Sequence, residues 1–193
     1  MPPKSKISPE AILDAATQIT REKGIGSVNA RELAKALGCS IHPVFTSFQS
    51  MDNLKIDLYK KTENIFDDHM KSGMGRHPIP FLGLGLAYIE FAKTEKNLFK
   101  FLFMSDEYKG RSVFDMMKDD ENRQVVGMIS GATGLNYENA ERLFIDIWVM
   151  THGIASMAAT DNSDFSEEQT VKILMDTFSG LKNQFKSIEE KKK

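Results

Sequence analysis

The sequence predicts an all-α fold, and three observations support this prediction. Apolar residues recur over long segments at the i, i+3, i+4, i+7 spacing of an amphipathic helix. Strict alternation of apolar and polar residues, which is typical of half-buried strands, is almost absent. Only six prolines interrupt 193 residues, of which 41% are hydrophobic. The chain can therefore form long helices around a substantial core.

The composition also limits the class of protein. The longest apolar runs are shorter than the roughly 20 residues that a transmembrane helix needs, and the N-terminus has no apolar signal-peptide core. Cys39 is the single cysteine, so neither an internal disulfide nor a cysteine-based zinc site can form. We therefore expect a cytoplasmic protein with no membrane partner.

Charge is distributed unevenly, although the net charge is only −2. Residues 1–60 hold eight Lys or Arg and six Asp or Glu, whereas residues 61–193 hold seventeen and twenty-one. A mildly basic N-terminal part on an acidic body favours a nucleic-acid-binding head carried by a separate domain.

The first predicted helix begins after Ser8, which can cap it, with Pro9 at the first helical position and Glu10 near the positive end of the dipole. Gly24 and Gly26 end it. Its apolar positions form a stripe on one side: Ile12, Ala15, Ala16 and Ile19.

Two short helices follow, joined by a tight turn. Asn29 can cap the first of them, and Gly38 ends it. Cys39 fills the turn, and Ser40 is predicted to cap the second helix. A turn of about three residues with a glycine makes the two helices cross steeply. The inward positions of the first short helix are Ala30, Leu33, Ala34 and Leu37.

The second short helix has two different faces. Val44 and Phe48 face inward at i, i+4, and Pro43 lies in the first turn, where its missing N–H costs little. The residues predicted to point outward are Ile41, His42, Phe45 and Thr46. Exposed apolar side chains indicate a partner, and this spacing is that of a helix-turn-helix, whose second helix enters the major groove of DNA. The alternative is an α-hairpin that only packs.

These residues resemble the N-terminal domain of TetR/AcrR-type transcriptional regulators over residues 1–55. The resemblance rests on Leu33-Ala34, on Gly38-Cys39-Ser40, on Phe45 and Phe48, and on Ser50-Met51-Asp52-Asn53-Leu54. It implies an all-helical fold of an N-terminal three-helix helix-turn-helix domain, residues 1–55, and a C-terminal ligand-binding and dimerisation domain, residues 56–193. It also implies a homodimer that binds a palindromic operator, usually as a repressor released by a small ligand.

Two positions depart from the family pattern. A tyrosine that typically contacts phosphate is Phe45 here, and a lysine that does the same is Met51. Because phosphate contacts supply much of the affinity and its salt dependence, both should be reduced. Lys4 and Lys6 are a possible arm. The candidate DNA-contacting residues are Asn29, Ser40, Ile41, His42, Pro43, Phe45, Thr46 and Lys55; among them Ile41, His42 and Thr46 are expected to read bases, partly through thymine methyl groups.

The rest of the chain predicts further helices. The helix begun at Asp52 continues through residues 56–70, and the resemblance makes it the link between the two domains. Residues 72–75, with Pro78 and Pro80, are predicted to break the chain. Further helices are predicted at residues 81–93, 96–104, 113–129, 136–159 and from 166 onward; the helix at 96–104 is so apolar that it must be buried.

The last two predicted helices each carry an apolar stripe. Asn136 caps the first, and Ser166 with Gln169 forms a capping box at the start of the second. Two such pairs make a four-helix dimer interface, and the alternative is that both stripes pack internally. The stripes are Leu143, Ile147, Met150 and Ile154, then Val171, Leu174, Phe178, Leu181 and Phe185.

The many methionines and phenylalanines of the C-terminal part indicate a ligand pocket, because flexible methionine side chains and flat aromatic rings suit an apolar cavity. Trp148, His152 and Gly153 also resemble a Trp-His-Gly signature of one TetR-type subgroup. His152 could equally be a satisfied core histidine, and each candidate could be simple core. The candidates are Tyr88, Phe103, Met117, Met128, Trp148 and His152. A small, mostly apolar effector is expected.

The sequence carries no pattern of catalysis. None of the four histidines is spaced i, i+4 from another, no glycine-rich loop follows a strand, and no nucleophile stands in a familiar setting. We therefore expect no catalytic residues, no metal and no cofactor, with an all-α enzyme as a weaker alternative. The leading hypothesis is a ligand-responsive homodimeric repressor. The runner-up is a regulator-like interaction module with weak or lost DNA affinity.

Overall fold

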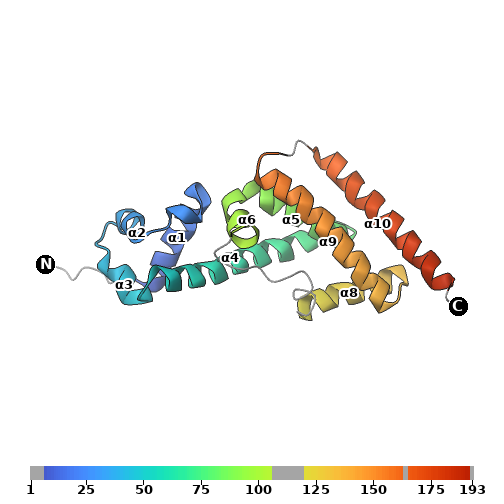
Figure 1. Cartoon of the computed structure of the whole chain (residues 1–193), viewed down its shortest axis with the longest axis horizontal. Helices are drawn as coiled ribbons and strands as arrows, with labels where there is room; N and C mark the ends of the chain where they lie inside the picture. The colour runs from blue at the N-terminus through green and yellow to red at the C-terminus, as the bar shows by residue number, and fades with distance from the viewer. Residues whose placement is uncertain (1–6, 106–119, 163–164, 192–193) are drawn as a thin grey trace. The chain divides into compact units, whose positions relative to one another are not determined.

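The structure is a computed structural model that describes residues 7–105, 120–162 and 165–191. Every regular element within these ranges is a helix, as Figure 1 shows. The predicted all-α class, with a helix-turn-helix near the N-terminus and a helical C-terminal part, is confirmed. No helix in the described ranges combines the length and apolarity that crossing a membrane requires.

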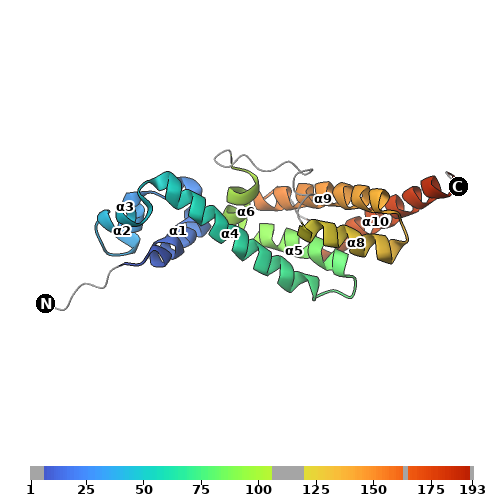
Figure 2. The same cartoon turned by 90° about the horizontal axis from the view of Figure 1, so that it is seen from below.

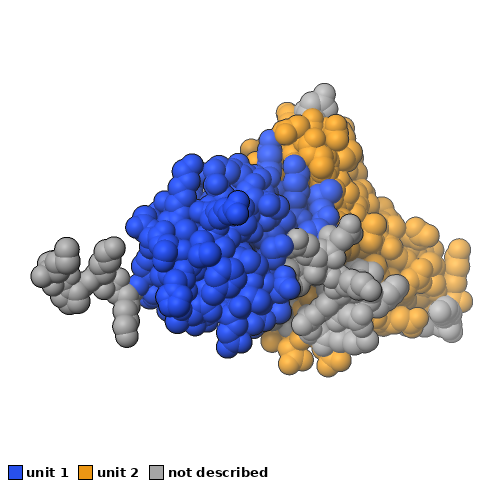
Figure 3. Space-filling model, turned by 60° about the vertical axis from the view of Figure 1, so that its left-hand side comes forward, with its two compact units in different colours: residues 1–68, 95–108 blue, residues 69–94, 109–193 orange. Residues whose placement is uncertain are grey.

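The chain divides into two compact units, coloured separately in Figure 3. Unit 1 consists of Met1–Asp68 and Glu95–Tyr108, and unit 2 of His69–Thr94 and Lys109–Lys193. Residues 95–105 thus belong to the same unit as the N-terminal helices, although residues 69–94, which lie between them in the sequence, belong to unit 2. Each unit has its own buried core.

Unit 1 contains the helices predicted for the N-terminal part. They are α1 (Pro9–Lys23), the 3-10 turn η1 (Ile25–Ser27), α2 (Ala30–Ala36), α3 (His42–Phe48), most of α4 (Met51–Met74) and α6 (Lys96–Phe103). Their apolar faces meet in one cluster of buried side chains: Ile12, Ala16, Ile19, Val28, Leu33, Val44, Phe48, Leu54, Leu58 and Phe101.

The predicted starts of α1 and α2 are confirmed. The Ser8 hydroxyl accepts a hydrogen bond from the Ala11 N–H at 3.1 Å. Gly24, with φ at +80°, ends α1 in a conformation that favours glycine. The Asn29 side-chain oxygen accepts from the backbone N–H groups of Arg31 and Glu32. These caps satisfy N–H groups that have no partner inside the helix.

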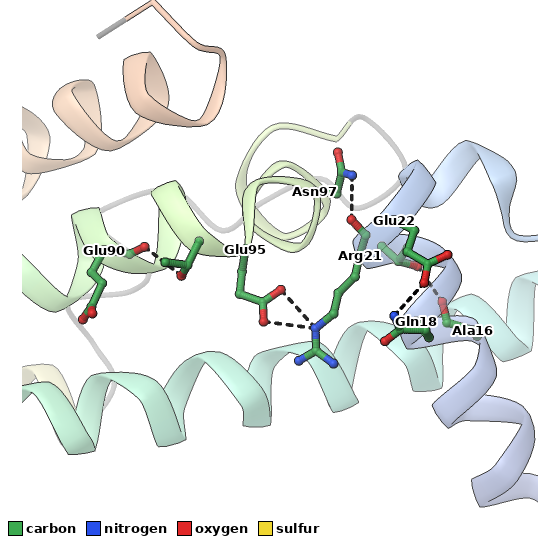
Figure 4. A network of polar contacts seen from close by, with 9 residues as sticks. Ala16, Gln18, Arg21, Glu22, Glu90, Glu95 and Asn97 are labelled. Carbon is green, nitrogen blue, oxygen red and sulfur yellow. Dashed lines mark hydrogen bonds and ion pairs between the residues drawn. The ribbon is translucent and has the colours of Figure 1, made fainter. Parts of the chain in front are cut away.

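The attachment of α6 to α1 adds polar contacts to the shared core of unit 1. The Arg21 Nε donates to both carboxylate oxygens of Glu95 at 3.0 Å, as Figure 4 shows. The Asn97 side-chain amide donates to the Arg21 carbonyl at 2.8 Å, which satisfies an acceptor in the last turn of α1. The Tyr59 ring of α4 meets the edge of Phe101 at 5.7 Å between centroids.

Unit 2 is organised around α9 (Tyr137–Ala159), which packs against α5 (Pro80–Thr94), α8 (Asp120–Thr133) and α10 (Glu167–Glu190). Figure 2 shows these helices in the second view. The predicted Asn136 cap and the Ser166–Gln169 capping box are both present. The core cluster of unit 2 is Val126, Ile129, Leu135, Ala140, Leu143, Phe144, Ile147 and Phe185.

The break predicted at residues 72–75 is wrong for its first part, because α4 continues to Met74. Gly73 lies inside the helix, and a Cβ atom there would overlap the Cβ of Ala87 on α5. A Cβ at Gly83 would lie 2.9 Å from the Gly73 carbonyl oxygen. The glycines therefore permit close helix packing, a role that local sequence does not separate from a turn.

The predicted helix at 113–129 is partly outside the described residues, since residues 113–119 are not described. Its described part, α8, extends past Gly131 to Thr133. Gly134, with φ at +71°, follows the helix in the left-handed conformation. Gly131 is thus accommodated inside the helix, and the helix ends before Gly134.

Candidate nucleic-acid interface

The helix-turn-helix of unit 1 is held together by inward side chains of α2 and α3. Leu33 and Val44 are fully buried, and Phe48 is 6% exposed. All three join Ile12 and Ala16 of α1 in the core cluster. The predicted inward face of α3 is therefore confirmed, and packing against α1 fixes which face of α3 remains at the surface.

The turn between α2 and α3 depends on Gly38, whose φ is +63°. This left-handed conformation is costly for residues with a Cβ atom. The N–H groups of Leu37 and Cys39 donate to the carbonyls of Leu33 and Ala34, each at 3.0 Å, so the last turn of α2 is satisfied as it closes. The predicted turn position of Gly38 is confirmed.

Ser40 does not cap α3, contrary to the prediction. The helix begins at His42, Ile41 occupies the cap position, and no side-chain cap hydrogen bond is present. The Ile41 backbone is already helical, with φ −69° and ψ −15°, whereas a side-chain cap needs an extended backbone at that position. The Ser40 side chain is exposed one residue before the cap, where it stays a predicted phosphate contact.

The outward face of α3 matches the prediction. Ile41 is 47% exposed and Phe45 is 40% exposed, and His42 and Thr46 are also exposed. The Thr46 hydroxyl donates to the His42 carbonyl at 2.9 Å, so its proton is used within the helix. Pro43 lies in the first turn of α3, as predicted, and is half-buried.

The remaining DNA-contact candidates lie on other elements. The Asn29 amide donates to the Ser27 carbonyl at 3.2 Å while its oxygen caps α2, so this side chain already serves the fold. Lys55 lies on α4 and is half-buried. Lys4 and Lys6 lie outside the described residues.

The segment of residues 33–51, from the middle of α2 to the first residue of α4, contains no carboxylate side chain. Glu32 and Asp52 bracket it, and between them Lys35 is the single Lys, Arg, Asp or Glu. Glu32 itself pairs with Lys23 at 3.4 Å. Along residues 33–51, a polyanion therefore meets no negatively charged side chain that would repel it. It also meets only one Lys or Arg there.

A second group of candidates comes together in unit 2, on α5 and α9. The Tyr88 side chain is 5% exposed, and its hydroxyl lies 2.9 Å from His152 Nδ1. The Trp148 ring stacks on the His152 ring, with centroids 5.0 Å apart and planes at 11°. Trp148 and His152 lie four residues apart on α9, where side chains are neighbours on one face of the helix.

Burial disfavours the charged forms of both polar groups in this aromatic cluster, Tyr88, Trp148 and His152. It lowers the pKa of the His152 imidazole from its usual 6.5 and raises the pKa of the Tyr88 phenol well above its usual 10.0. A neutral imidazole has one donor and one acceptor nitrogen, so the contact at Nδ1 joins two uncharged groups, and its direction follows the tautomer of His152.

The other ligand candidates lie elsewhere. Phe103 belongs to unit 1, where it packs against Phe66 and Phe99 at 5.2 and 4.9 Å between centroids. Met128 lies on α8 and is 49% exposed. Met117 lies outside the described residues. The structure thus brings Tyr88, Trp148 and His152 together within unit 2, whereas Phe103 belongs to the core packing of unit 1 and Met128 is exposed on α8.

Sequence reasoning missed two polar groupings. One is the attachment of α6 through Arg21, Glu95 and Asn97, in which Arg21 is more than seventy residues from the other two and no local signal links them. The other surrounds His69, whose Nε2 lies 3.1 Å from the Ala87 carbonyl oxygen and 3.5 Å from Glu90. Among the described residues, no group of His, Cys, Asp and Glu is arranged to hold a metal ion.

Comparisons with known proteins support the fold. No protein-family model matches the sequence, and no curated protein matches it significantly. A solved structure from Rhodococcus sp. RHA1, described as a protein with unknown function, is similar over 96% of this chain and 99% of its own, with a TM-score of 0.71. At 16% sequence identity this likeness shows a shared helical fold.

Proposed function

We propose that this protein is a ligand-responsive transcriptional regulator of the TetR type, in which α3 binds the major groove of an operator. The observation that carries the proposal is the exposed face of α3, since Ile41 and Phe45 stand outward on the second helix of a helix-turn-helix. The absence of carboxylates from residues 33–51 also favours a polyanionic partner. The proposal is for a binding role in the cytoplasm and not for catalysis.

DNA binding is tested by a mobility-shift assay with the genomic DNA that flanks the gene, at low and moderate salt. We expect one fragment to be retained above the others at both salt concentrations. Phosphate contacts are few, so affinity should fall less steeply with salt than is usual for such regulators. Retention without any sequence preference at either salt would contradict the proposal.

The runner-up function is a regulator-like interaction module with weak or lost DNA affinity. Phe45 and Met51 favour it, because neither side chain can hydrogen-bond a phosphate. The mobility-shift assay separates the two functions, since the module should bind all fragments alike or none.

The proposed regulator is a homodimer that pairs through α9 and α10. The stripe predicted for this interface on α9 packs internally instead, because Leu143, Ile147 and Ile154 are buried within one chain. Val149 and Met157 are 54% and 38% exposed, and they lie four residues to either side of Gly153 on α9. The space above Gly153 is open, so a second helix can approach closely there. Val149→Glu should convert the dimer to a monomer in sedimentation velocity, and a wild-type monomer would contradict this arrangement.

The proposed effector is a small, mostly apolar molecule that binds near the aromatic cluster. It would lower operator affinity by preferring a conformation whose recognition helices no longer match half-sites about 34 Å apart. Trp148 is the single tryptophan, so its fluorescence reports binding directly. A thermal-shift screen in which only anionic, hydrophilic compounds stabilise the protein would contradict the proposal.

A further inference from the structure

The base-reading helix lacks the side chains that usually read bases by paired hydrogen bonds. The sequence of α3, HPVFTSF, contains no Arg, Lys, Asn or Gln. Those four residue types supply the bidentate contacts to guanine and adenine. Gln49 follows α3 at its C-terminal end, whereas recognition helices contact base edges mainly with their N-terminal residues. Selectivity from α3 therefore needs another source.

The groups that α3 offers at its N-terminal end are mostly apolar. Ile41 and Phe45 are exposed and lie four residues apart, so their side chains are neighbours on one face. Thr46 lies beside them, and its hydroxyl proton is donated to the His42 carbonyl. Its methyl group thus adds to the apolar surface, and the His42 ring remains the main hydrogen-bonding group of this face.

The major groove presents one kind of apolar group, the C5-methyl of thymine. Apolar side chains such as Phe and the Thr methyl contact it. The surrounding charge suits this occupant, because residues 33–51 hold Lys35 and no Asp or Glu that would repel phosphates. An apolar face free of carboxylates therefore fits the wall of a groove lined by pyrimidine methyl groups.

We propose that α3 selects its DNA site by contact with pyrimidine C5-methyl groups, with Ile41 and Phe45 as the specificity-determining residues. The half-site should therefore be rich in thymine at the positions that face them. 5-Methylcytosine carries a methyl group at the same place on the ring, so it should substitute for thymine better than cytosine does. This inference rests on the DNA-binding function proposed above.

The test changes the DNA and leaves the protein intact. Duplexes that bind full-length protein are first selected from a random-sequence library. Each thymine of the selected site is then replaced singly by deoxyuridine, which removes only the methyl group. We expect about a fourfold loss of affinity for each methyl that is buried against α3, and about a fourfold gain of 5-methylcytosine over cytosine at those positions.

Protein variants show which side chains cause the preference for thymine over uracil. Phe45→Ala and Ile41→Ala should bring the thymine-to-uracil affinity ratio close to one at the positions that they contact. Lys55→Ala is the matched control, because losing a phosphate contact weakens binding to both duplexes and leaves their ratio unchanged. Both substituted residues, Ile41 at the cap position and Phe45 on α3, are exposed, and circular dichroism checks that the helices remain.

Three negative results are possible, and they differ in what they overturn. If the library yields no preferred duplex, both the proposed function and this inference are overturned, as they would be if the apolar face served a protein partner. If a duplex is selected but every uracil-substituted version binds equally well, only the methyl-reading inference is overturned. A ratio that persists in Phe45→Ala and Ile41→Ala would also overturn it, because other residues would then read the methyl groups.

Discussion

The two compact units assemble their candidate sites in different ways. In unit 1 the outward residues of α3 lie within a few positions of one another, and their direction follows from two inward residues of the same helix. In unit 2, Tyr88 and His152 meet across 64 residues of chain. A local site can therefore be predicted from spacing, whereas a site built from distant helices needs the packing that brings them together.

The largest expected effect is a difference in stability loss between phenylalanine-to-alanine substitutions on the two faces of α3. Phe48→Ala removes a ring that is 6% exposed and should lower the free energy of unfolding by about 3–5 kcal/mol. Phe45→Ala removes a ring that is 40% exposed and should cost less than about 1 kcal/mol. Urea denaturation followed by circular dichroism measures both. Equal losses would mean that Phe45 is part of the core.

The next effect concerns close packing in unit 2. Gly73→Ala places a Cβ against Ala87 and should destabilise the protein by about 1–3 kcal/mol. Gly127→Ala is the matched control, since this helical glycine has open space around it and alanine should stabilise it by about 0.4–1 kcal/mol. Thermal unfolding compares them. A neutral Gly73→Ala variant would show that α4 and α5 can separate at no cost.

A third comparison separates base reading from phosphate binding within unit 1. Thr46→Ala should change which DNA sequence binds best, because it alters the face of α3. Lys55→Ala should weaken binding to all sequences and reduce the slope of log affinity against log salt by about 1 for each subunit. Titrations at several salt concentrations measure both slopes. If both variants weaken binding equally for all sequences, Thr46 does not read bases.

The smallest expected effect is a pH dependence of stability that arises in unit 2. Burial lowers the pKa of folded His152, so below its usual 6.5 the unfolded chain binds more protons than the folded chain. Stability should therefore fall as pH drops through this range, and less so in His152→Gln. Denaturation followed by Trp148 fluorescence at several pH values measures this loss of stability in unit 2.

The raised pKa of Tyr88 predicts a loss of stability at alkaline pH. Above pH 10.0 the unfolded phenol ionises while the buried one stays neutral, so stability should also fall at alkaline pH. Tyr88→Phe should reduce that alkaline loss, because it removes the titrating group and keeps the ring. An unchanged alkaline limb in this variant would show that other groups cause it.

The sequence determined the helical class, the caps at Ser8, Asn29, Asn136 and Ser166, and the inward face of α3. Each of these depends on residues within about one or two helical turns, where geometry is fixed by the backbone itself. Ser40 failed as a cap because Ile41 had already become helical, a one-residue shift in helix start that composition does not reveal.

Only the tertiary structure decided which distant helices meet. It placed α6 against α1 in unit 1, although α6 follows α5 in the chain, and it turned Gly73 from a predicted break into a packing position. It also assigned Phe103 to unit 1, and Tyr88, Trp148 and His152 to unit 2. An apolar stripe indicates that a helix face is buried, but it does not indicate which helix covers it, because apolar stripes have nearly the same chemistry. Shape complementarity between whole helices therefore selects the packing partner.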